Sequence, residues 1–436
     1  MNVTGIIAEY NPFHNGHLYQ IDQVKKKGTD YIIVVMSGDF LQRGTPALLD
    51  KWKRTHMALL SGADLVIELP AVFSTASAQY FARSGVSILD KLGVVDTISF
   101  GCESDNIRLI KQTASFLWNE PDNYQKQLQY FIKNGNSFPK ARELALTNIL
   151  NTQNTESFSA KHTSLHTGTE NASIVKDVAS LVSSPNNILA LEYVIALLER
   201  GSSMDILPIK REGNGYHDKE LNKNDNPSAT AIREILETAS LTDLIKLTDF
   251  LPESVFSIIK EAFKTQAFVW QDDFSLLLKY KLLLNGAISL HKYADVSEDL
   301  SDKILKNLRY YQNYSQFCSL LKSKELTYSR INRALTHILL DITETMYDDV
   351  KENDYASYAR ILGFRKEAKP LLSEIGRQTS IPLVSKLADA SSVLSKEAYH
   401  YLEHDIFCAH VYESIIAQKN NIPMKNEFTR QIVITS

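Results

Sequence analysis

Cysteine is scarce in this sequence. The chain has 436 residues and three cysteines, Cys102, Cys318 and Cys408, which are far apart and odd in number. This spacing provides neither a disulfide framework nor the CxxC pair of a zinc site, and it fits a reducing compartment. Long hydrophobic runs are absent too, since no apolar stretch approaches the roughly 20 residues that span a bilayer. The N-terminal run, residues 1–9, has neither a basic leader nor a cleavage site. We therefore expect a cytoplasmic protein without membrane contact.

Charge of either sign is not in excess. The 47 Lys and Arg residues nearly balance the 51 Asp and Glu residues, giving a formal net charge of −4. This balance excludes an indiscriminate phosphate binder, so any nucleic acid must be bound by a local patch. Hydrophobic residues make up 44% and charged residues 22%, which excludes a wholly disordered chain. The length predicts two or three domains of about 100–200 residues each.

Short apolar runs alternate with helical patterns over the first 240 residues. Strands are predicted at residues 3–8, 30–36, 64–69, 94–100 and 204–210, and helices at 17–27, 51–61, 76–92 and 187–199. This alternation is typical of βαβ units, so we predict an α/β fold with a Rossmann-like parallel sheet in a domain of residues 1–240. Polar residues 161–175 are predicted to form an insertion or a loop. In residues 241–436 apolar positions recur every three or four residues, which predicts a mainly α-helical second domain.

A glycine-containing turn lies between the first predicted strand and the first predicted helix. The turn contains His14, Asn15, Gly16 and His17. Gly16 lets the backbone approach a ligand closely, and the free N–H groups of the helix start attract an anion. Two imidazoles at a spacing of three can face the same anion. The turn therefore favours phosphate binding over the two alternatives, half of a metal site or a pair of surface histidines.

A second motif, SATAIR at residues 228–233, heads a predicted helix. Ser228 is a predicted N-cap, and Thr230 and Arg233 would point toward phosphates. The pair of motifs resembles the HxGH nucleotidyltransferase superfamily, whose members activate a substrate by adenylyl transfer from ATP.

Longer blocks resemble one family of that superfamily, the tRNA(Met) cytidine acetate ligases. The blocks are AEYNPFHNGH (8–17), MSGDFLQRG (36–44), KWKRTHMALLSGADLVIELP (51–70), FGCES (100–104), SPNNILALEY (184–193), GYHD (215–218), SATAIR and IPLVSKL (381–387). They span nearly the whole chain in the expected order. The resemblance implies that ATP and acetate form acetyl-adenylate with release of pyrophosphate. The acetyl group would then pass to N4 of the wobble cytidine of elongator tRNA(Met), and no protein partner is implied.

The resemblance also implies which residues bind ATP. The catalytic pair would be His14 and His17, on the phosphates. ATP contacts carry over to Ile7, Ala8, Glu9, Tyr10, Asn11, Pro12, Phe13, His14, Asn15, Gly16, His17, Leu18, Tyr19, Gln20, Gly101, Asn186 and Arg211. Phosphate contacts of the wider superfamily carry over to Ser228, Thr230 and Arg233. Mg²⁺ is a candidate companion of ATP, but no acidic pair identifies its ligands, and no protein metal ligand is predicted.

Basic residues cluster twice in the predicted helical domain. The first cluster includes Lys306, Arg309, Lys322, Arg330 and Arg333, with Tyr310, Tyr311, Tyr314 and Phe317 interleaved as base-stacking platforms would be. The second includes Arg360, Arg365 and Lys366. Either cluster alone could be a solvated helix face, and the resemblance favours tRNA contact for both.

Two smaller patterns have more than one interpretation. Lys51, Lys53 and Arg54 open a predicted helix, where the helix dipole disfavours cations, and this conflict indicates a phosphate partner, either ATP or RNA. His400, His404 and Cys408 are spaced four apart, which allows a metal site on one helix face. We expect an ordinary helix face, because the implied chemistry needs no metal there.

Two other functions stay open at this point. A cofactor adenylyltransferase would share both phosphate motifs, but such enzymes are compact and would not need the helical residues after 241. A non-catalytic RNA-binding protein with a nucleotide pocket would have no need of both motifs.

Overall fold

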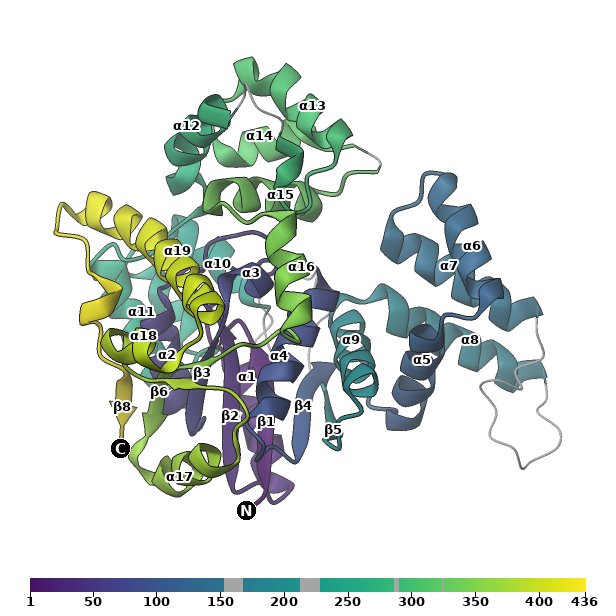
Figure 1. Ribbon diagram of the computed structural model, residues 1–436, viewed down its shortest axis with the longest axis horizontal. Helices are drawn as coiled ribbons and strands as arrows, with labels where there is room; N and C mark the ends of the chain where they lie inside the picture. The colour runs from purple at the N-terminus through teal and green to yellow at the C-terminus, as the bar shows by residue number, and fades with distance from the viewer. Residues whose placement is uncertain (153–167, 212–227, 286–289, 324) are drawn as a thin grey trace.

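A parallel sheet forms the centre of the protein (Figure 1). The computed structural model describes residues 1–152, 168–211, 228–285, 290–323 and 325–436. The five parallel strands are β1 (Val3–Ala8), β2 (Tyr31–Ser37), β3 (Leu65–Leu69), β4 (Thr97–Cys102) and β5 (Asp205–Lys210), in the order β5-β4-β1-β2-β3. All five predicted strands are confirmed, with ends shifted by three residues at most. Both faces of the central strands are covered, so their apolar runs are nearly continuous.

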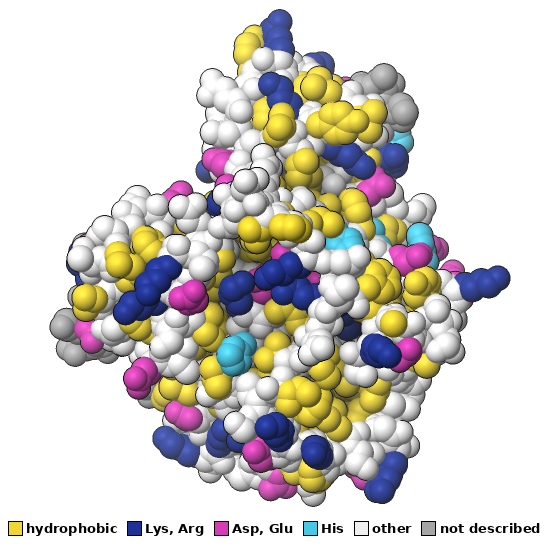
Figure 2. Space-filling view, turned by 90° about the vertical axis from the view of Figure 1, so that its left-hand side faces the viewer, with side chains coloured by type: hydrophobic (Ala, Val, Ile, Leu, Met, Phe, Trp, Pro, Cys, Tyr) yellow, Lys and Arg dark blue, Asp and Glu magenta, His cyan; other side chains and the backbone are white. Residues whose placement is uncertain are grey.

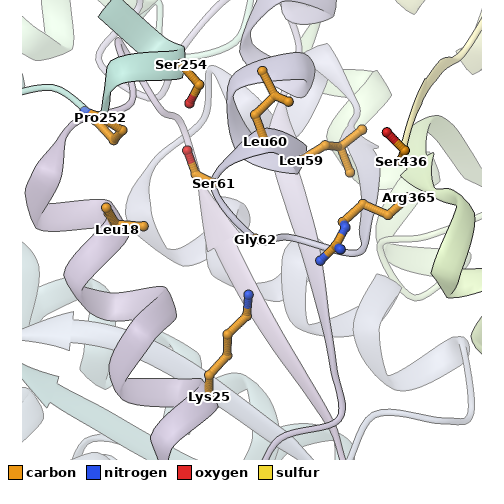
Figure 3. A pocket seen from close by; sticks show the side chains of 10 residues that line it. All are labelled: Leu18, Lys25, Leu59, Leu60, Ser61, Gly62, Pro252, Ser254, Arg365 and Ser436. Atoms are coloured by element: carbon orange, nitrogen blue, oxygen red, sulfur yellow. The ribbon is translucent and has the colours of Figure 1, made fainter.

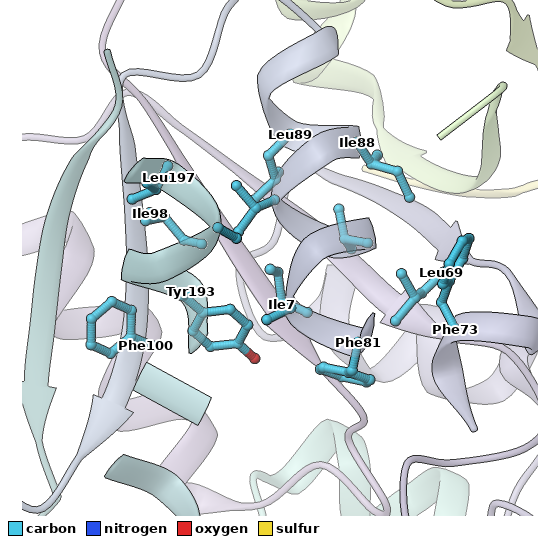
Figure 4. Packing of buried hydrophobic residues seen from close by; sticks show 14 of the residues in the cluster. Ile7, Leu69, Phe73, Phe81, Ile88, Leu89, Ile98, Phe100, Tyr193 and Leu197 are labelled. Carbon is cyan, nitrogen blue, oxygen red and sulfur yellow. The ribbon is translucent and has the colours of Figure 1, made fainter. Parts of the chain in front are cut away.

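Helices cover both faces of this sheet. On one face lie α1 (Asn15–Lys26) and α2 (Lys51–Leu60), and on the other lie α4 (Ala78–Lys91) and α9 (Pro185–Arg200). Figure 4 shows Ile7 of β1 packed among Phe81 and Leu89 of α4 and Tyr193 of α9. A Cβ added at Gly85 of α4 would lie 2.5 Å from the Ile7 side chain, so only glycine lets α4 approach β1 this closely. The strand that leads to the histidine motif is therefore rigidly supported.

Three further strands come from the C-terminal half of the chain. Strand β6 (Ala359–Arg365) pairs antiparallel with β3, and β7 (Leu383–Val384) and β8 (Val433–Thr435) pair with β6. The sequence pattern did not predict β6, because its isolated run gives no sign of the neighbour it pairs with. The division of the chain at residue 240 stays a prediction, but the sheet continues across it.

A helical insertion separates β4 from β5 in sequence. It consists of α5 (Ile107–Asn119), α6 (Asp122–Lys133), α7 (Phe138–Thr152) and α8 (Gly168–Ser183), on the right of Figure 1. The predicted insertion or loop at residues 161–175 lies partly in α8, and residues 161–167 lie outside the described residues. Among the described residues, no single helix is long and apolar enough to cross a membrane. One pair of helical segments, Val175–Ser183 and Pro185–Arg200, is together long and apolar enough, but the two segments meet at an angle of 92°.

The rest of the chain is mainly helical, as predicted. The remaining helices are α3 (Ala71–Ser74), α10 (Ala229–Thr238), α11 (Glu253–Lys264), α12 (Ser275–Asn285), α13 (Glu298–Asn307), α14 (Tyr314–Leu321), α15 (Tyr328–Leu340), α16 (Glu344–Glu352), α17 (Lys369–Gln378), α18 (Ala390–Val393) and α19 (Lys396–Asn420). Helices α12 to α15 form a lobe at the top of Figure 1, around an apolar core that α16 and α19 also join. We call α12 to α15 the helical lobe.

Candidate active site

The histidine motif forms the start of α1. The side chain of His14 is the N-cap of this helix: its Nδ1 accepts a hydrogen bond from the Gly16 backbone N–H at 3.0 Å. The Nδ1 of His17 accepts one from the His14 backbone N–H at 3.3 Å. The two rings stack with centroids 3.8 Å apart and an interplanar angle of 25°. This reciprocal capping fixes both imidazoles in one orientation.

These hydrogen bonds assign the tautomer of both imidazoles. Because each Nδ1 is an acceptor, each neutral ring has its proton on Nε2. Burial and the nearby Arg211 and Arg233 lower the pKa of His14 to about 3. Burial, followed by His14 and Arg211, also lowers the pKa of His17 well below its usual value. The pair therefore offers two neutral N–H donors to a ligand, and the arginines supply the positive charge.

The second motif lies directly beside the first. Ser228 caps α10, as predicted, by accepting from the Ala231 N–H at 3.2 Å. Arg233 donates to the Asn11 carbonyl oxygen at 2.7 Å and to the Thr230 hydroxyl at 3.1 Å. The structure thus brings the turn before His14 and the start of α10 together, although 222 residues separate Arg233 from Asn11.

Gly101 and Arg211 lie where the strand order changes direction. Strands β2 and β3 follow on one side of β1, and β4 and β5 on the other, so the switch point lies between β1 and β4. Ligands of such sheets bind at this point, outside the carboxyl ends of the strands. A Cβ on Gly101 would lie 3.6 Å from Arg211 Cγ, so these two residues are neighbours at this edge. The electrostatic effect of Arg211 on both histidines places it in the same site.

Asn186 lies at the start of α9, near the end of β4. Its side-chain amide is 3.4 Å from the Glu103 carboxylate. The adjacent Asn187, which the sequence did not single out, is buried and accepts from the Glu103 backbone N–H at 2.9 Å. Asn187 therefore fixes the loop after β4 and leaves Asn186 half-buried at the rim.

The other predicted ATP residues surround the histidine pair. Ile7 and Ala8 end β1, residues 9–14 form the turn, and residues 15–20 open α1. The buried rings of Tyr10 and Phe13 pack on His17, with centroids 4.9 and 5.4 Å away. Some residues of the predicted ATP segment, Tyr10 and Phe13, therefore support the histidine pair through packing. No group of three or more His, Cys, Asp or Glu residues that could hold a metal ion occurs among the described residues, so we assign no Mg²⁺ ligands.

Arg54 supports this turn from α2, and the prediction that Lys51 and Arg54 face a phosphate is wrong. The buried Arg54 guanidinium donates to the carbonyl oxygens of Glu9 at 2.8 Å, Ser37 at 3.0 Å and Leu49 at 2.9 Å, and also to that of Gly38. Lys51 is equally buried, and its ammonium lies 2.8 Å from Glu68 and 3.2 Å from Glu427. The positive charges of Lys51 and Arg54 are therefore compensated by carboxylates and carbonyl groups of the protein, not by a bound phosphate.

Residues 38–50, the loop after β2, connect the histidine motif to the helical lobe. At one side of this β2 loop, the Gln42 N–H donates to Glu9 Oε1 at 2.8 Å and the Leu48 N–H to Asn11 Oδ1 at 2.7 Å. At the other side, Asn332 of α15 donates to the carbonyl of residue 43 at 2.7 Å, and Thr336 to that of Gly44 at 2.6 Å. The sequence blocks included residues 38–44 of this loop but gave no indication of this bridging.

The first basic cluster is exposed in part. Lys306, Arg309, Lys322 and Arg330 are exposed on the helical lobe, whereas Arg333 is half-buried and pairs with Asp295 at 2.9 Å. Among the four predicted stacking residues, Tyr310 is 51% exposed and lies under the Arg309 guanidinium at 4.6 Å. The prediction fails for Tyr311, Tyr314 and Phe317, which are buried in the core of the lobe. Their spacing reflects packing between helices.

The second basic cluster does not lie at the carboxyl ends of β1 to β5, where the histidine motif lies. Arg365 ends β6, which runs antiparallel to β3, and its N–H donates to the Asp64 carbonyl at the amino end of β3. There Arg365 and Lys25 point into a cavity of about 370 Å³ (Figure 3), and Arg365 lies 3.6 Å from both Asp64 and Glu367. Lys366 follows it and is exposed. The RNA contact predicted with Arg360 is wrong, because Arg360 is buried and pairs with Glu68 and Glu427.

The His400, His404 and Cys408 pattern contributes to helix packing. His404 Nε2 lies 2.8 Å from the Leu340 carbonyl oxygen at the end of α15, and Cys408 is buried beside it. His400 is exposed at the other end of this row. The row thus joins α19 to the helical lobe.

Comparison with known proteins identifies the family. The chain matches the HIGH Nucleotidyl Transferase model over residues 1–427. A tRNA(Met) cytidine acetate ligase of Thermoanaerobacter sp. (strain X514) is 40% identical over 424 residues, which are 97% of this chain and 96% of the relative. The chain belongs to the tRNA(Met) cytidine acetate ligase family. A second tRNA(Met) cytidine acetate ligase, from Caldanaerobacter subterraneus, is 37% identical over 99% of this chain and 100% of its own length.

A solved structure supports both the family and the fold. The crystal structure of Thermotoga maritima TmcAL bound with alpha-thio ATP has a TM-score of 0.86 and 29% identity, over 100% of both chains. Its apo form has a TM-score of 0.88 and 30% identity over the same extent. The resemblance of the sequence blocks to the acetate ligase family and the predicted fold class are therefore confirmed.

Proposed function

We propose that this protein is an ATP-dependent acetate ligase that acetylates elongator tRNA(Met). Acetate and ATP would form acetyl-adenylate, and the acetyl group would pass to N4 of the wobble cytidine, giving N4-acetylcytidine. The observation that carries the proposal is the junction of the two phosphate motifs, where Arg233 donates to Asn11 at the switch point of the sheet. A member of the acetate ligase family has a use for both motifs and for the helical lobe.

The site residues suit the first step, in which acetate attacks the α-phosphorus and pyrophosphate leaves. The Nε2–H groups of His14 and His17 would donate to phosphate oxygens, and Arg211 and Arg233 would offset their charge. Adenylyl transfer requires positioned donors more than a protein nucleophile. The three cysteines form no disulfide and are buried, so we assign them no part in this reaction. Unpaired cysteines also agree with the proposed cytoplasmic location.

The helical lobe suits the second step, in which tRNA must reach the adenylate. We assign tRNA contact to Lys306, Arg309, Lys322 and Arg330, with Tyr310 as a stacking surface. The β2 loop holds this lobe against the turn before His14. On the face shown in Figure 2, basic and acidic side chains are interspersed, which agrees with recognition by a local patch rather than by the field of the whole protein.

One experiment separates this function from the two alternatives. The protein is incubated with ATP, labelled acetate and bulk tRNA, and labelled N4-acetylcytidine is expected in the digested tRNA. A cofactor adenylyltransferase would release pyrophosphate only with a coenzyme precursor, and an RNA-binding protein would show no turnover.

The histidine variants then locate the first step. His14→Ala and His17→Ala should each abolish acetyl-adenylate formation and leave the Kd for tRNA within about twofold, because the histidines face ATP. His56→Ala, an exposed histidine on α2, is the matched control and should retain activity. Parallel loss of tRNA binding in the His14 and His17 variants would contradict this division of labour.

A further inference from the structure

Acetyl transfer requires a group that accepts a proton, and the histidine pair does not provide it. The attacking N4 amine of cytidine must lose a proton as the amide forms. Both Nδ1 atoms already accept backbone N–H groups, so the Nε2 atoms of His14 and His17 carry the hydrogens. Arg211 and Arg233 have no acceptor atom. A protein group that accepts this proton must therefore be sought elsewhere at the carboxyl edge of the sheet.

Glu9 is the carboxylate of the histidine motif itself. It follows the last residue of β1, at the switch point, and it is half-buried. Its Oε1 accepts the Gln42 N–H at 2.8 Å, and its backbone carbonyl accepts from Arg54 at 2.8 Å. These two contacts orient the side chain and the backbone separately. The second carboxyl oxygen, Oε2, takes part in neither contact.

The carboxylates of the neighbouring strand ends are less suited to this role. Asp39, after β2, is 7% exposed; its Oδ1 accepts the Lys51 N–H at 2.7 Å and its Oδ2 lies 3.9 Å from the Lys51 ammonium. Glu103, after β4, is exposed and turned toward Asn186. Glu9 combines a fixed orientation with access to the site.

We propose that the Glu9 carboxylate is the general base of the acetyl transfer step. This inference rests on the proposed function. The N4 lone pair forms a bond to the carbonyl carbon of acetyl-adenylate, and the bond from that carbon to the phosphate oxygen breaks. AMP leaves with the electron pair, and the N4 proton passes to a Glu9 carboxyl oxygen and from there to water. No oxidant or further reactant is needed.

The groups that face Glu9 are compatible with this role. Arg54 of α2 presents a positive charge to it, and Tyr193 of α9 faces it from the opposite layer of helices. Burial raises the pKa of the Tyr193 phenol, so this group stays neutral. The β2 loop contributes the Gln42 N–H. Neither Arg54 nor Tyr193 carries a carboxylate that would compete for the proton.

The test separates the two chemical steps. Acetyl-adenylate formation is measured by acetate-dependent exchange of labelled pyrophosphate into ATP, and transfer is measured by single-turnover labelling of tRNA. Glu9→Gln keeps the shape and the acceptor oxygen for Gln42, so exchange should fall far less than transfer, even though Glu9 belongs to the segment expected to contact ATP. Transfer should fall by roughly 10²–10⁴-fold, the usual contribution of a general base.

Two further variants complete the experiment. Glu103→Gln makes the same chemical change on the adjacent strand end and should leave both steps within about threefold of wild type. Glu9→Asp retains a carboxylate and should recover part of the transfer rate. Equal loss of exchange and transfer in Glu9→Gln, or unchanged transfer, would overturn the assignment. Wild-type protein without exchange or transfer would instead refute the proposed function.

Discussion

His14 is a buried imidazole whose surroundings oppose its protonation. Its Nδ1 is committed to the Gly16 N–H, it lies 3.8 Å from the His17 ring, and two arginines are close. At the residue scale, hydrogen-bond donation and positive charge are therefore supplied by different side chains. The histidines supply directed donors, and the arginines supply positive charge that does not depend on pH.

Acid should destabilise the protein measurably through this residue. An unfolded histidine has a pKa of about 6.5, whereas burial and the nearby arginines lower the pKa of His14 to about 3. Between these values the unfolded chain binds more protons, so the free energy of unfolding falls as the pH drops from about 6.5 toward 3. His14 alone should cost about 2 kcal/mol between pH 8 and pH 5.

The variant His14→Asn removes this titration and keeps a good N-cap residue. Urea unfolding at about pH 8 and pH 5 should show a pH-dependent loss smaller by ~2 kcal/mol than that of the wild type. An unchanged loss would mean that His14 is protonated in the folded protein at pH 5.

The sequence predicted local motifs well, but it did not predict which charged side chains are buried. HNGH and SATAIR were predicted to lie at helix starts, and both do, because each combines a capping residue with a local polar pattern. Lys51 and Arg360 were assigned to phosphate or RNA, yet both are compensated by Glu427, more than 60 residues from either. Burial by a distant partner leaves no local signal in a sequence.

At the element scale, the β2 loop links the turn before His14 to α15. Gly44 in this loop has a φ of +70°, and a Cβ there would lie 2.5 Å from the Arg333 backbone N. Glycine thus satisfies two requirements, a left-handed backbone and direct contact with a helix. The loop can approach α15 closely enough for Asn332 and Thr336 to hold its carbonyl groups.

The substitution Gly44→Ala should destabilise the protein by at least about 3 kcal/mol, because backbone strain and a backbone clash act together. Gly28→Ala is a matched control: Gly28 has a φ of +88°, and nothing lies within 4 Å of its added Cβ. That variant should lose only about 1–2 kcal/mol. Thermal unfolding measures the stability of both variants. An equal loss of stability in the two would show that α15 can move to make room for the new methyl group.

Elements were predictable where their signal is local. The five parallel strands and the helices next to them follow from continuous apolar runs and amphipathic spacing. Strand β6 was missed because its place is determined by pairing with β3, almost 300 residues earlier. The insertion of α5 to α8 was not recognised as a helical unit, and its position beside β4 and β5 becomes clear only in the folded chain (Figure 1).

At the scale of the whole molecule, the two basic clusters lie apart, the first on the helical lobe and the second at the amino edge of the sheet. Arg330 precedes Asn332 on α15, which contacts the β2 loop beside the histidine motif. Arg365 lies at the amino end of β3, next to Asp64 and Glu367. Under the proposed function, a wobble base bound beside the histidine motif would bring the anticodon loop toward the helical lobe that carries Arg330, whereas Arg365 lies at the amino end of β3.

Replacing these two arginines should therefore have different effects on tRNA binding. Arg330→Gln should weaken binding and reduce the slope of log K against log salt concentration by about 0.7–0.9, because one phosphate contact is lost. Arg365→Gln removes the same charge from a position already balanced by carboxylates, so affinity and slope should stay close to wild type. Filter binding at several salt concentrations measures both quantities. Equal effects would show that tRNA extends around the sheet to its amino edge, and the assignment of recognition to the helical lobe would then be wrong.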